Sequence, residues 1–259
     1  MIELIYFVVI ILANIIGAIS GMGGGVIIKP IFDFIGEHSL VEISFYSSTA
    51  AFCMSILSIG KQIKNKMNIE LDKVFLMSTG ALIGGVIGNN LFVLLLQMWG
   101  NEDEVKLIQI AITIFVLIFT LIYATTNNLS MNLKYKGWYS IIGIILGTLS
   151  SLLGIGGGPI NVAVLMLCFG ITIKNATVYS IITILFSQFS KIVMIMLNEE
   201  FFTYDLSMLL YVVPASALGG FIGALCSSKC EDKHVKIIYQ IVIFIVILIN
   251  VYNGIALLL

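Results

Sequence analysis

The sequence predicts an all-α polytopic membrane protein built from two repeats of inverted topology. Three observations lead to this fold class. First, 59% of the 259 residues are hydrophobic and 10% are charged, against about 45–50% and about 25% in soluble globular domains. Second, apolar runs long enough for a helix to cross a bilayer, about 20 residues, recur along the whole chain. Third, a glycine-rich break occurs twice, and the charges of equivalent loops are exchanged between the two copies.

The two halves of the chain carry the same landmarks in the same order. GMGGG at 21–25 aligns with GIGGG at 154–158, an offset of 133 residues (154 − 21). Two further pairs are GALIGGVIG (80–88) with SALGGFIG (216–223), offset 135 (219 − 84), and EDEVK (102–106) with EDKHVK (231–236), offset 130 (235 − 105). Because internal repeats mark repeated structural units, the predicted repeats are 1–128 and 129–259.

Each half is predicted to hold a long helix, a glycine break, a short helix and three long helices, each an apolar run that ends at a break or a polar loop. The expected segments are about 2–20, 25–36, 41–60, 71–98 and 106–125, then about 137–153, 158–170, 175–197, 205–226 and 235–258. The short segments would span roughly 18 Å as helices, less than a hydrocarbon core of about 30 Å. Either all five segments cross, or three cross and the broken pair forms a re-entrant hairpin. The sequence leaves both open.

Loop charges predict the orientation. The loop at 61–73 holds lysines, whereas its partner at 198–205 holds acidic charges and no lysine. The loop at 99–106 is acidic apart from Lys106, whereas its partner at 227–236 holds three lysines (Lys229, Lys233 and Lys236). Short loops rich in lysine stay on the cytoplasmic side. The exchange therefore predicts inverted repeats, with both termini outside.

Other classes of protein receive little support. A net charge of −1 without a basic block argues against a nucleic-acid partner. His38 and His234 lie in loops far apart in sequence, and Cys226 and Cys230 form a lone C-x3-C pair. We therefore predict no catalytic constellation, no metal site and no cofactor. The expected partners are the lipid bilayer and a small anionic substrate, and the sequence leaves open whether copies associate into a homo-oligomer.

The glycine breaks predict an anion site. Paired broken helices in inverted repeats are typical of secondary transporters, and a new helix N-terminus after each break presents free N–H groups and partial positive charge. The candidate substrate-binding backbone is Gly23, Gly24 and Gly25 with Gly156, Gly157 and Gly158. The alternative for these glycines is close helix packing, which is the favoured interpretation of the glycines at 80–88 and 219–223.

Polar side chains near the breaks complete the candidate site. Lys29 lies one helical turn after Gly25. It either binds the anion, pairs with Asp33, or extends toward the membrane–water interface. The other candidates are Asn161 after the second break, Ser48 and Thr49 in the third segment, and Gln188 in the eighth. The hydroxyls could instead bond their own backbone. Lys191 belongs to a second polar cluster, with Ser187, Gln188 and Ser190, that either completes the cavity or, for Lys191, reaches the acidic loop that follows it.

The duplicated G-x-G-G-G with proline after the second copy, the cluster Ser47-Ser48-Thr49 and the stretch GALIGGVIG resemble the TauE/SafE sulfite-exporter family over nearly the whole chain. The resemblance implies a multi-pass protein of the cell (inner) membrane that moves sulfite, organosulfonates or related sulfur or carboxylate anions. The chain departs from the family pattern at Lys191, where a glycine is common, and at Ser47, which leaves the substrate open. We expect an alternating-access secondary transporter, not an enzyme, with a passive anion channel as the alternative.

Overall fold

The computed structural model describes residues 2–64, 70–126, 130–198, 201–202 and 204–259. Within these ranges the elements are α1 (Ile2–Ser20), α2 (Gly25–Ile35), α3 (Leu40–Lys64), α4 (Leu71–Trp99), α5 (Glu102–Thr125), α6 (Gly137–Leu153), α7 (Gly158–Phe169), α8 (Ile173–Met196), the 3-10 helix η2 (Leu206–Met208), α9 (Leu209–Lys229) and α10 (Asp232–Leu258). The predicted all-α class is confirmed for the described residues.

Seven of the described helices are long and apolar enough to cross a membrane: α1, α3, α4, α5, α8, α9 and α10. The apolar helices α6 and α7 are shorter, with 17 and 12 residues. Each short helix α2 or α7 begins directly after a glycine break, as the sequence predicts. The prediction of a polytopic membrane protein is therefore confirmed.

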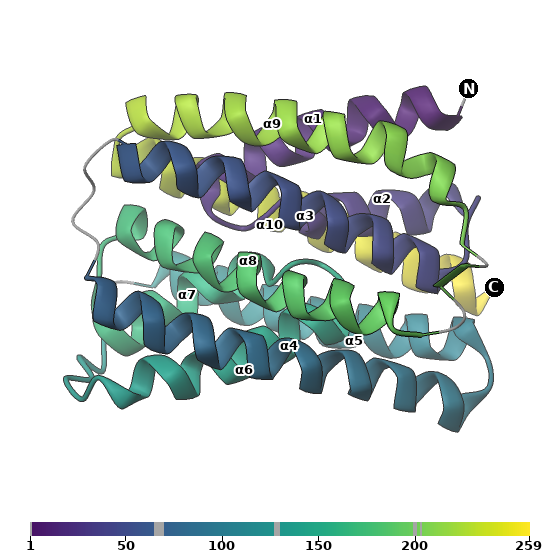
Figure 1. Ribbon diagram of the computed structural model, residues 1–259, viewed down its shortest axis with the longest axis horizontal. Coiled ribbons are helices and arrows are strands. Elements are labelled where there is room, and N and C mark those ends of the chain that lie inside the picture. Colours follow the sequence, from purple (N-terminus) through teal and green to yellow (C-terminus); the bar gives the residue numbers. More distant parts are fainter. Residues whose placement is uncertain (1, 65–69, 127–129, 199–200, 203) are drawn as a thin grey trace.

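Corresponding helices of the two halves run in opposite directions. In Figure 1, α3 and α5 run away from the end that holds both termini, whereas α8 and α10 run toward it. Likewise α4 runs toward that end and α9 away from it. We call the end with both termini the terminal end, and the opposite end the lysine end.

Packing partners are exchanged between the halves in the same way. Helix α4 packs along α6 and α8, and α9, its counterpart, packs along α1 and α3. Helices α3 and α8 pack on each other, as do α5 and α10. The helices that pack on α9 are therefore the counterparts of those that pack on α4.

Glycines allow the closest of these helix contacts. A Cβ on Gly84 of α4 would lie 2.2 Å from the carbonyl oxygen of Ile144 in α6. At the equivalent contact, a Cβ on Gly219 of α9 would lie 2.7 Å from the carbonyl oxygen of Ile11 in α1. Such distances leave no room for a side chain, so these two glycines serve close helix packing. This is the interpretation that the sequence analysis favoured for them.

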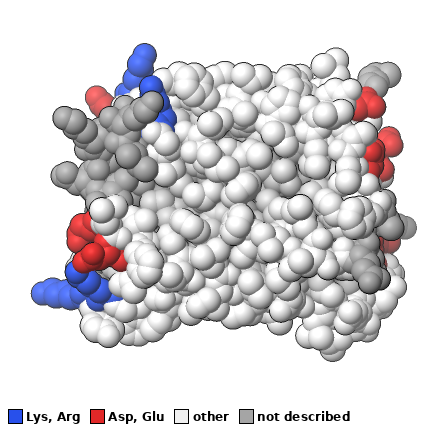
Figure 2. Space-filling model, viewed as in Figure 1, with Lys and Arg blue, Asp and Glu red and all other residues white. Residues whose placement is uncertain are grey.

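The two ends of the bundle differ in charge (Figure 2). The lysine end carries, alongside Glu70, Asp72, Glu231 and Asp232, the lysines Lys61, Lys73, Lys134, Lys136, Lys174, Lys229, Lys233 and Lys236. The terminal end carries Lys106 and the acidic residues Glu3, Glu37, Glu42, Glu102, Asp103, Glu104 and Asp205. The Lys64 side chain, and Lys66, Glu199 and Glu200 entirely, lie outside the described part of the loops used for the orientation prediction.

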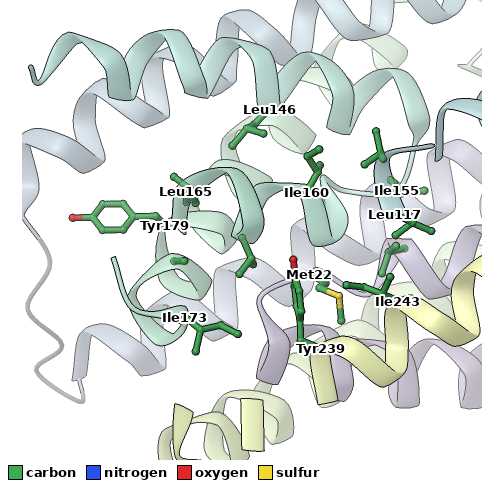
Figure 3. Packing of buried hydrophobic residues seen from close by; sticks show 14 of the residues in the cluster. Met22, Leu117, Leu146, Ile155, Ile160, Leu165, Ile173, Tyr179, Tyr239 and Ile243 are labelled. Atoms are coloured by element: carbon green, nitrogen blue, oxygen red, sulfur yellow. The ribbon is translucent and has the colours of Figure 1, made fainter. Parts of the chain in front are cut away.

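Buried apolar side chains fill the space between the glycine breaks and the pair α5 and α10 (Figure 3). Met22 and Ile155 lie within the two breaks, and Leu117 and Ile243 come from α5 and α10. All four side chains are at most 2% exposed. The breaks are therefore held on one side by a close-packed apolar core.

Candidate functional site

The first glycine break folds α1 and α2 into a hairpin. The Tyr6 ring stacks on Phe32, with ring centroids 3.6 Å apart, near the open end of the hairpin. At its closed end the backbone N–H of Gly23 donates to the carbonyl oxygen of Gly17, at 3.3 Å. Gly21 and Gly23 both have φ of 74°, a left-handed conformation that glycine adopts without strain. The chain thus turns back inside the bundle toward the terminal end (Figure 1).

The second break repeats this arrangement from the opposite end. The Tyr139 ring stacks on Phe169, with centroids 3.7 Å apart, and Tyr139 occupies the position equivalent to Tyr6 (6 + 133). Gly157 has φ of 90° and precedes Gly158, the first residue of α7. In both halves the chain thus folds back at the break, which is the shape of the re-entrant alternative that the sequence left open.

The two breaks lie against each other inside the bundle. A Cβ on Gly25 would lie 2.7 Å from the carbonyl oxygen of Ile155, and one on Gly23 would lie 3.4 Å from that of Gly156. The helix starts at Gly25 and Gly158 have no hydrogen bond from a capping side chain. Both helix starts therefore lie where the two breaks meet, and no side chain caps them.

An asparagine packs on each break. A Cβ on Gly157 would lie 2.2 Å from Nδ2 of Asn161, and a Cβ on Gly24 would lie 1.8 Å from Oδ1 of Asn14. Both asparagines are fully buried, and neither amide has a hydrogen-bond partner in the described chain. The sequence predicted Asn161 and missed Asn14. The signal for Asn14 was its place as a polar amide in the middle of the apolar run of α1.

The predicted polar residues of α3 and α8 are also buried, on the helices that flank the breaks. Ser47, next to Ser48 and Thr49, lies beside the first break, since a Cβ on Gly25 would be 2.8 Å from its Oγ. Buried side-chain atoms that lack a hydrogen-bond partner occur in Asn14, Ser48, Thr49, Ser150, Ser151, Asn161 and Gln188. Because buried polar atoms normally have partners, these atoms leave capacity for a polar ligand.

The sequence comparisons now identify the family. The sequence model described as Sulfite exporter TauE/SafE matches residues 6–249. The chain belongs to the TauE/SafE family. It is 22% identical to the "Probable membrane transporter protein YunE" of Bacillus subtilis (strain 168), over 95% of this chain and 96% of that protein. No solved structure matches.

A second relative is the "Probable membrane transporter protein" of Haemophilus influenzae (strain ATCC 51907 / DSM 11121 / KW20 / Rd). It is 30% identical over 66% of this chain and 63% of its own length. With the family match, these similarities make the chain a TauE/SafE membrane transporter.

In this TauE/SafE transporter, Lys29 is not a free cation. Its Nζ donates to Oδ2 of Asp33 at 2.9 Å, and both side chains are nearly fully buried. Lys106 approaches the same carboxylate, with Nζ 3.7 Å from Oδ1 of Asp33, and donates to the Asp33 backbone carbonyl at 3.2 Å. The structure thus shows the pairing of Lys29 with Asp33 that the sequence offered as the alternative to anion binding.

Lys191, which the sequence assigned either to a polar cluster at the cavity or to the acidic loop after it, lies at the second glycine break. Its side chain is fully buried and does not reach the loop after α8. Its Nζ donates to Oγ of Ser44 at 2.7 Å and to the carbonyl oxygen of Ser151 at 2.8 Å. A Cβ on Gly154 would lie 3.4 Å from this nitrogen. The ammonium therefore sits where α6 ends and the second break begins.

Proposed function

We propose that this protein is a secondary transporter of a small anion, a sulfur-containing oxyanion or organosulfonate, which binds where the two glycine breaks meet. The family description, Sulfite exporter TauE/SafE, supports the sulfur chemistry of the substrate. The buried Lys and Asp side chains support an anion: among the described residues they are Lys29, Lys191 and Asp33, whose formal charges sum to +1 (2 − 1).

The observation that carries the proposal is the surroundings of Lys191. Both of its hydrogen-bond acceptors are neutral, and no carboxylate of the described chain makes an ion pair with it. A buried ammonium without a counter-charge costs several kcal/mol. A bound anion would remove this cost and could also use the unpartnered hydroxyl and amide groups beside the breaks.

Two uncapped helix N-termini add to the same site. The first N–H groups of α2 and α7 lack intrahelical acceptors, and the helix dipoles favour negative charge there. The candidate binding residues are thus the glycines at 23–25 and 156–158, together with Ser48, Thr49, Asn161, Gln188 and the added Lys191. In this proposal Lys29 supports the site from one helical turn away.

Alternating access is the proposed mechanism. The opposite directions and exchanged packing partners of the two halves support a pair of inverted repeats at 1–128 and 129–259, which would rock around the site. The close-packed apolar core beside the breaks supports a carrier over an open channel. The concentration of lysine at one end supports a cytoplasmic lysine end and an outer terminal end.

The first test measures the thermal stability of the purified protein with sulfite, methanesulfonate, acetate, chloride and choline. A ligand at 100 times its Kd that binds only the folded state adds about 2.7 kcal/mol. Intrinsic tryptophan fluorescence suits the assay, because sulfite reacts with thiol dyes. We expect a selective rise in Tm with sulfite or methanesulfonate. A rise with choline and with none of the anions would overturn the anion proposal.

The second test separates carrier from channel. Sulfite uptake by proteoliposomes should saturate with concentration and accelerate when unlabelled sulfite is trapped inside, since a carrier exchanges substrate across its two states. Planar bilayers with the same protein should show no unitary currents. Unitary anion currents that scale linearly with voltage would contradict alternating access and leave the anion site intact.

A further inference from the structure

Two pockets lie at opposite ends of the bundle, and they occupy equivalent positions in the two halves. The terminal-end pocket, about 300 Å³, includes Asp33, Lys106, Asn253 and Ala256 in its lining. The lysine-end pocket, about 360 Å³, includes Met166, Lys236, Tyr123 and Thr126. These residues correspond one to one: 33 with 166 at the offset of 133, and 106 with 236, 123 with 253 and 126 with 256 at the offset of 130.

Each pocket lies beside a short helix that begins at a glycine break. Asp33 is two helical turns beyond Gly25 on α2, and Met166 is two turns beyond Gly158 on α7. Helices α5 and α10 line both pockets. The start of α5 and the end of α10 line the terminal-end pocket, and the end of α5 and the start of α10 line the lysine-end pocket. A solute that leaves the meeting point of the breaks along α2 or α7 therefore reaches one pocket or the other.

The two pockets differ in their charged residues. The lysine-end pocket is lined by Asp232, Lys233 and Lys236, and the terminal-end pocket by Asp33 and Lys106. At the terminal end, the Asp33 carboxylate lies between Lys29 and Lys106. Its Oδ1 is buried and makes no hydrogen bond, so the contact with Lys106 at 3.7 Å is a loose ion pair. At the lysine end, uncharged Met166 takes this place. Asp232 also lines that pocket, but no described carboxylate pairs with Lys236.

We infer that the two pockets are equivalent anion subsites at the two mouths of the transport route, and that Asp33 is a tethered anion that occupies the one at the terminal end. The inference rests on the proposed anion transport. A free anion that enters at the terminal end takes the place of the Asp33 carboxylate beside Lys106 and Lys29. The displaced carboxylate turns into the pocket that Asp33 lines, so its charge leaves the buried position as the charge of the free anion enters, and no lysine is left unpaired. At the lysine end an anion meets Lys236 without a competing carboxylate in that position.

The test measures protection of single thiols by methanesulfonate, an unreactive alkanesulfonate. The four cysteines are first replaced by serine, and Ala256→Cys or Thr126→Cys is then introduced, because both positions are exposed and line the pockets. Labelling with neutral N-ethylmaleimide in detergent gives the methanesulfonate concentration that halves the rate at each end. In the parent, protection should require about tenfold more methanesulfonate at Ala256→Cys than at Thr126→Cys.

Two substitutions test whether the carboxylate at position 33 causes the difference in protection between the two ends: one removes it at the terminal end, and the other adds a carboxylate at the lysine end. Asp33→Asn should lower the half-protecting concentration at Ala256→Cys about tenfold, and Met166→Asp should raise it about tenfold at Thr126→Cys. Lys106→Gln and Lys236→Gln should each abolish protection at their own end and leave the other end unchanged. Asp33→Asn leaves two lysines without a carboxylate and can therefore fail to fold. In that case the Met166→Asp, Lys106→Gln and Lys236→Gln variants test the inference.

Unchanged protection in Met166→Asp and in both lysine variants would overturn the inference. So would protection by added phosphatidylglycerol but not by methanesulfonate, which would assign the pockets to lipid headgroups. The experiment is independent of the central site. If protection follows the predicted pattern while Lys191→Met leaves the anion-dependent rise in Tm unchanged, the central site fails and the pocket subsites stand. If a sulfur oxyanion stabilises the protein and protection does not respond, only the subsites fail.

Discussion

Replacing Lys191 with methionine removes the buried charge at the breaks and keeps an unbranched side chain of similar length. The variant loses two hydrogen bonds from a charged donor, to Ser44 and to the carbonyl oxygen of Ser151. Such bonds contribute about 1.5–3 kcal/mol each. The variant also escapes the cost of burying an ammonium without a counter-charge, several kcal/mol. The free energy of unfolding without anion should therefore change by less than about 2 kcal/mol.

Anion binding should respond much more strongly. A unit charge about 4 Å from a bound anion contributes about 4 kcal/mol at an effective dielectric constant of about 20. Each 1.4 kcal/mol is a tenfold change in Kd. Allowing for relaxation of the site, Lys191→Met should weaken sulfite binding by about 100-fold to 1,000-fold. This separation of a small effect on stability from a large effect on binding is specific to a charge that faces the substrate.

The assay is titration of sulfite into purified protein, followed by the rise in Tm and by uptake into proteoliposomes. The matched control is Lys229→Met, which removes an exposed lysine at the end of α9. The control should keep the parental Kd. If Lys191→Met binds sulfite within about threefold of the parent, the ammonium does not contact the anion. If the variant instead loses more than about 3 kcal/mol of stability and keeps its Kd, Lys191 serves to hold α6 to α8.

Further predictions concern packing and buried pairs. Gly84→Ala should lower stability by about 3 kcal/mol, because its Cβ would lie 2.2 Å from a carbonyl oxygen of α6; Gly60→Ala, with open space around it, should be neutral or slightly stabilising in thermal denaturation. Tyr239→Phe should cost about 1–3 kcal/mol in the same assay, since its buried hydroxyl donates to a backbone carbonyl of α7 at 2.6 Å. Lys29→Ala should cost about 3 kcal/mol, and the double variant Lys29→Met with Asp33→Leu should recover most of it; additive losses would show that the two side chains are not coupled.

The sequence predicted the helices well because their lengths follow from the bilayer. Apolar runs and glycine breaks locate α1 to α10 with small errors at the ends, since a membrane helix must satisfy its backbone internally and ends where polar loops begin. The two breaks were also predicted, because glycine runs of the same pattern occur in both halves at an offset of 133 residues. The choice between crossing and re-entrant segments needed the structure, since it depends on contacts such as Tyr6 with Phe32.

The side-chain part of the site was predicted less well, for a physical reason. Lys29 lies closer in sequence to a break than Lys191 does, so sequence reasoning favoured it. In the structure, however, Asp33 neutralises Lys29 within its own helix, whereas Lys191 reaches the second break from α8. Ion pairs at i, i+4 can be anticipated from sequence. A contact between α8 and the end of α6 depends on how helices 40 residues apart pack together.

The backbone of this transporter is nearly symmetric, and its buried charges are not. Lys29 and Asp33 correspond to Val162 and Met166 at the offset of 133. The scaffold alone offers an anion the same helix N-termini and the same kind of pocket from either end. Any difference in anion affinity between the two ends must then come from the side chains, and Asp33 is the buried carboxylate that the described chain places on one side.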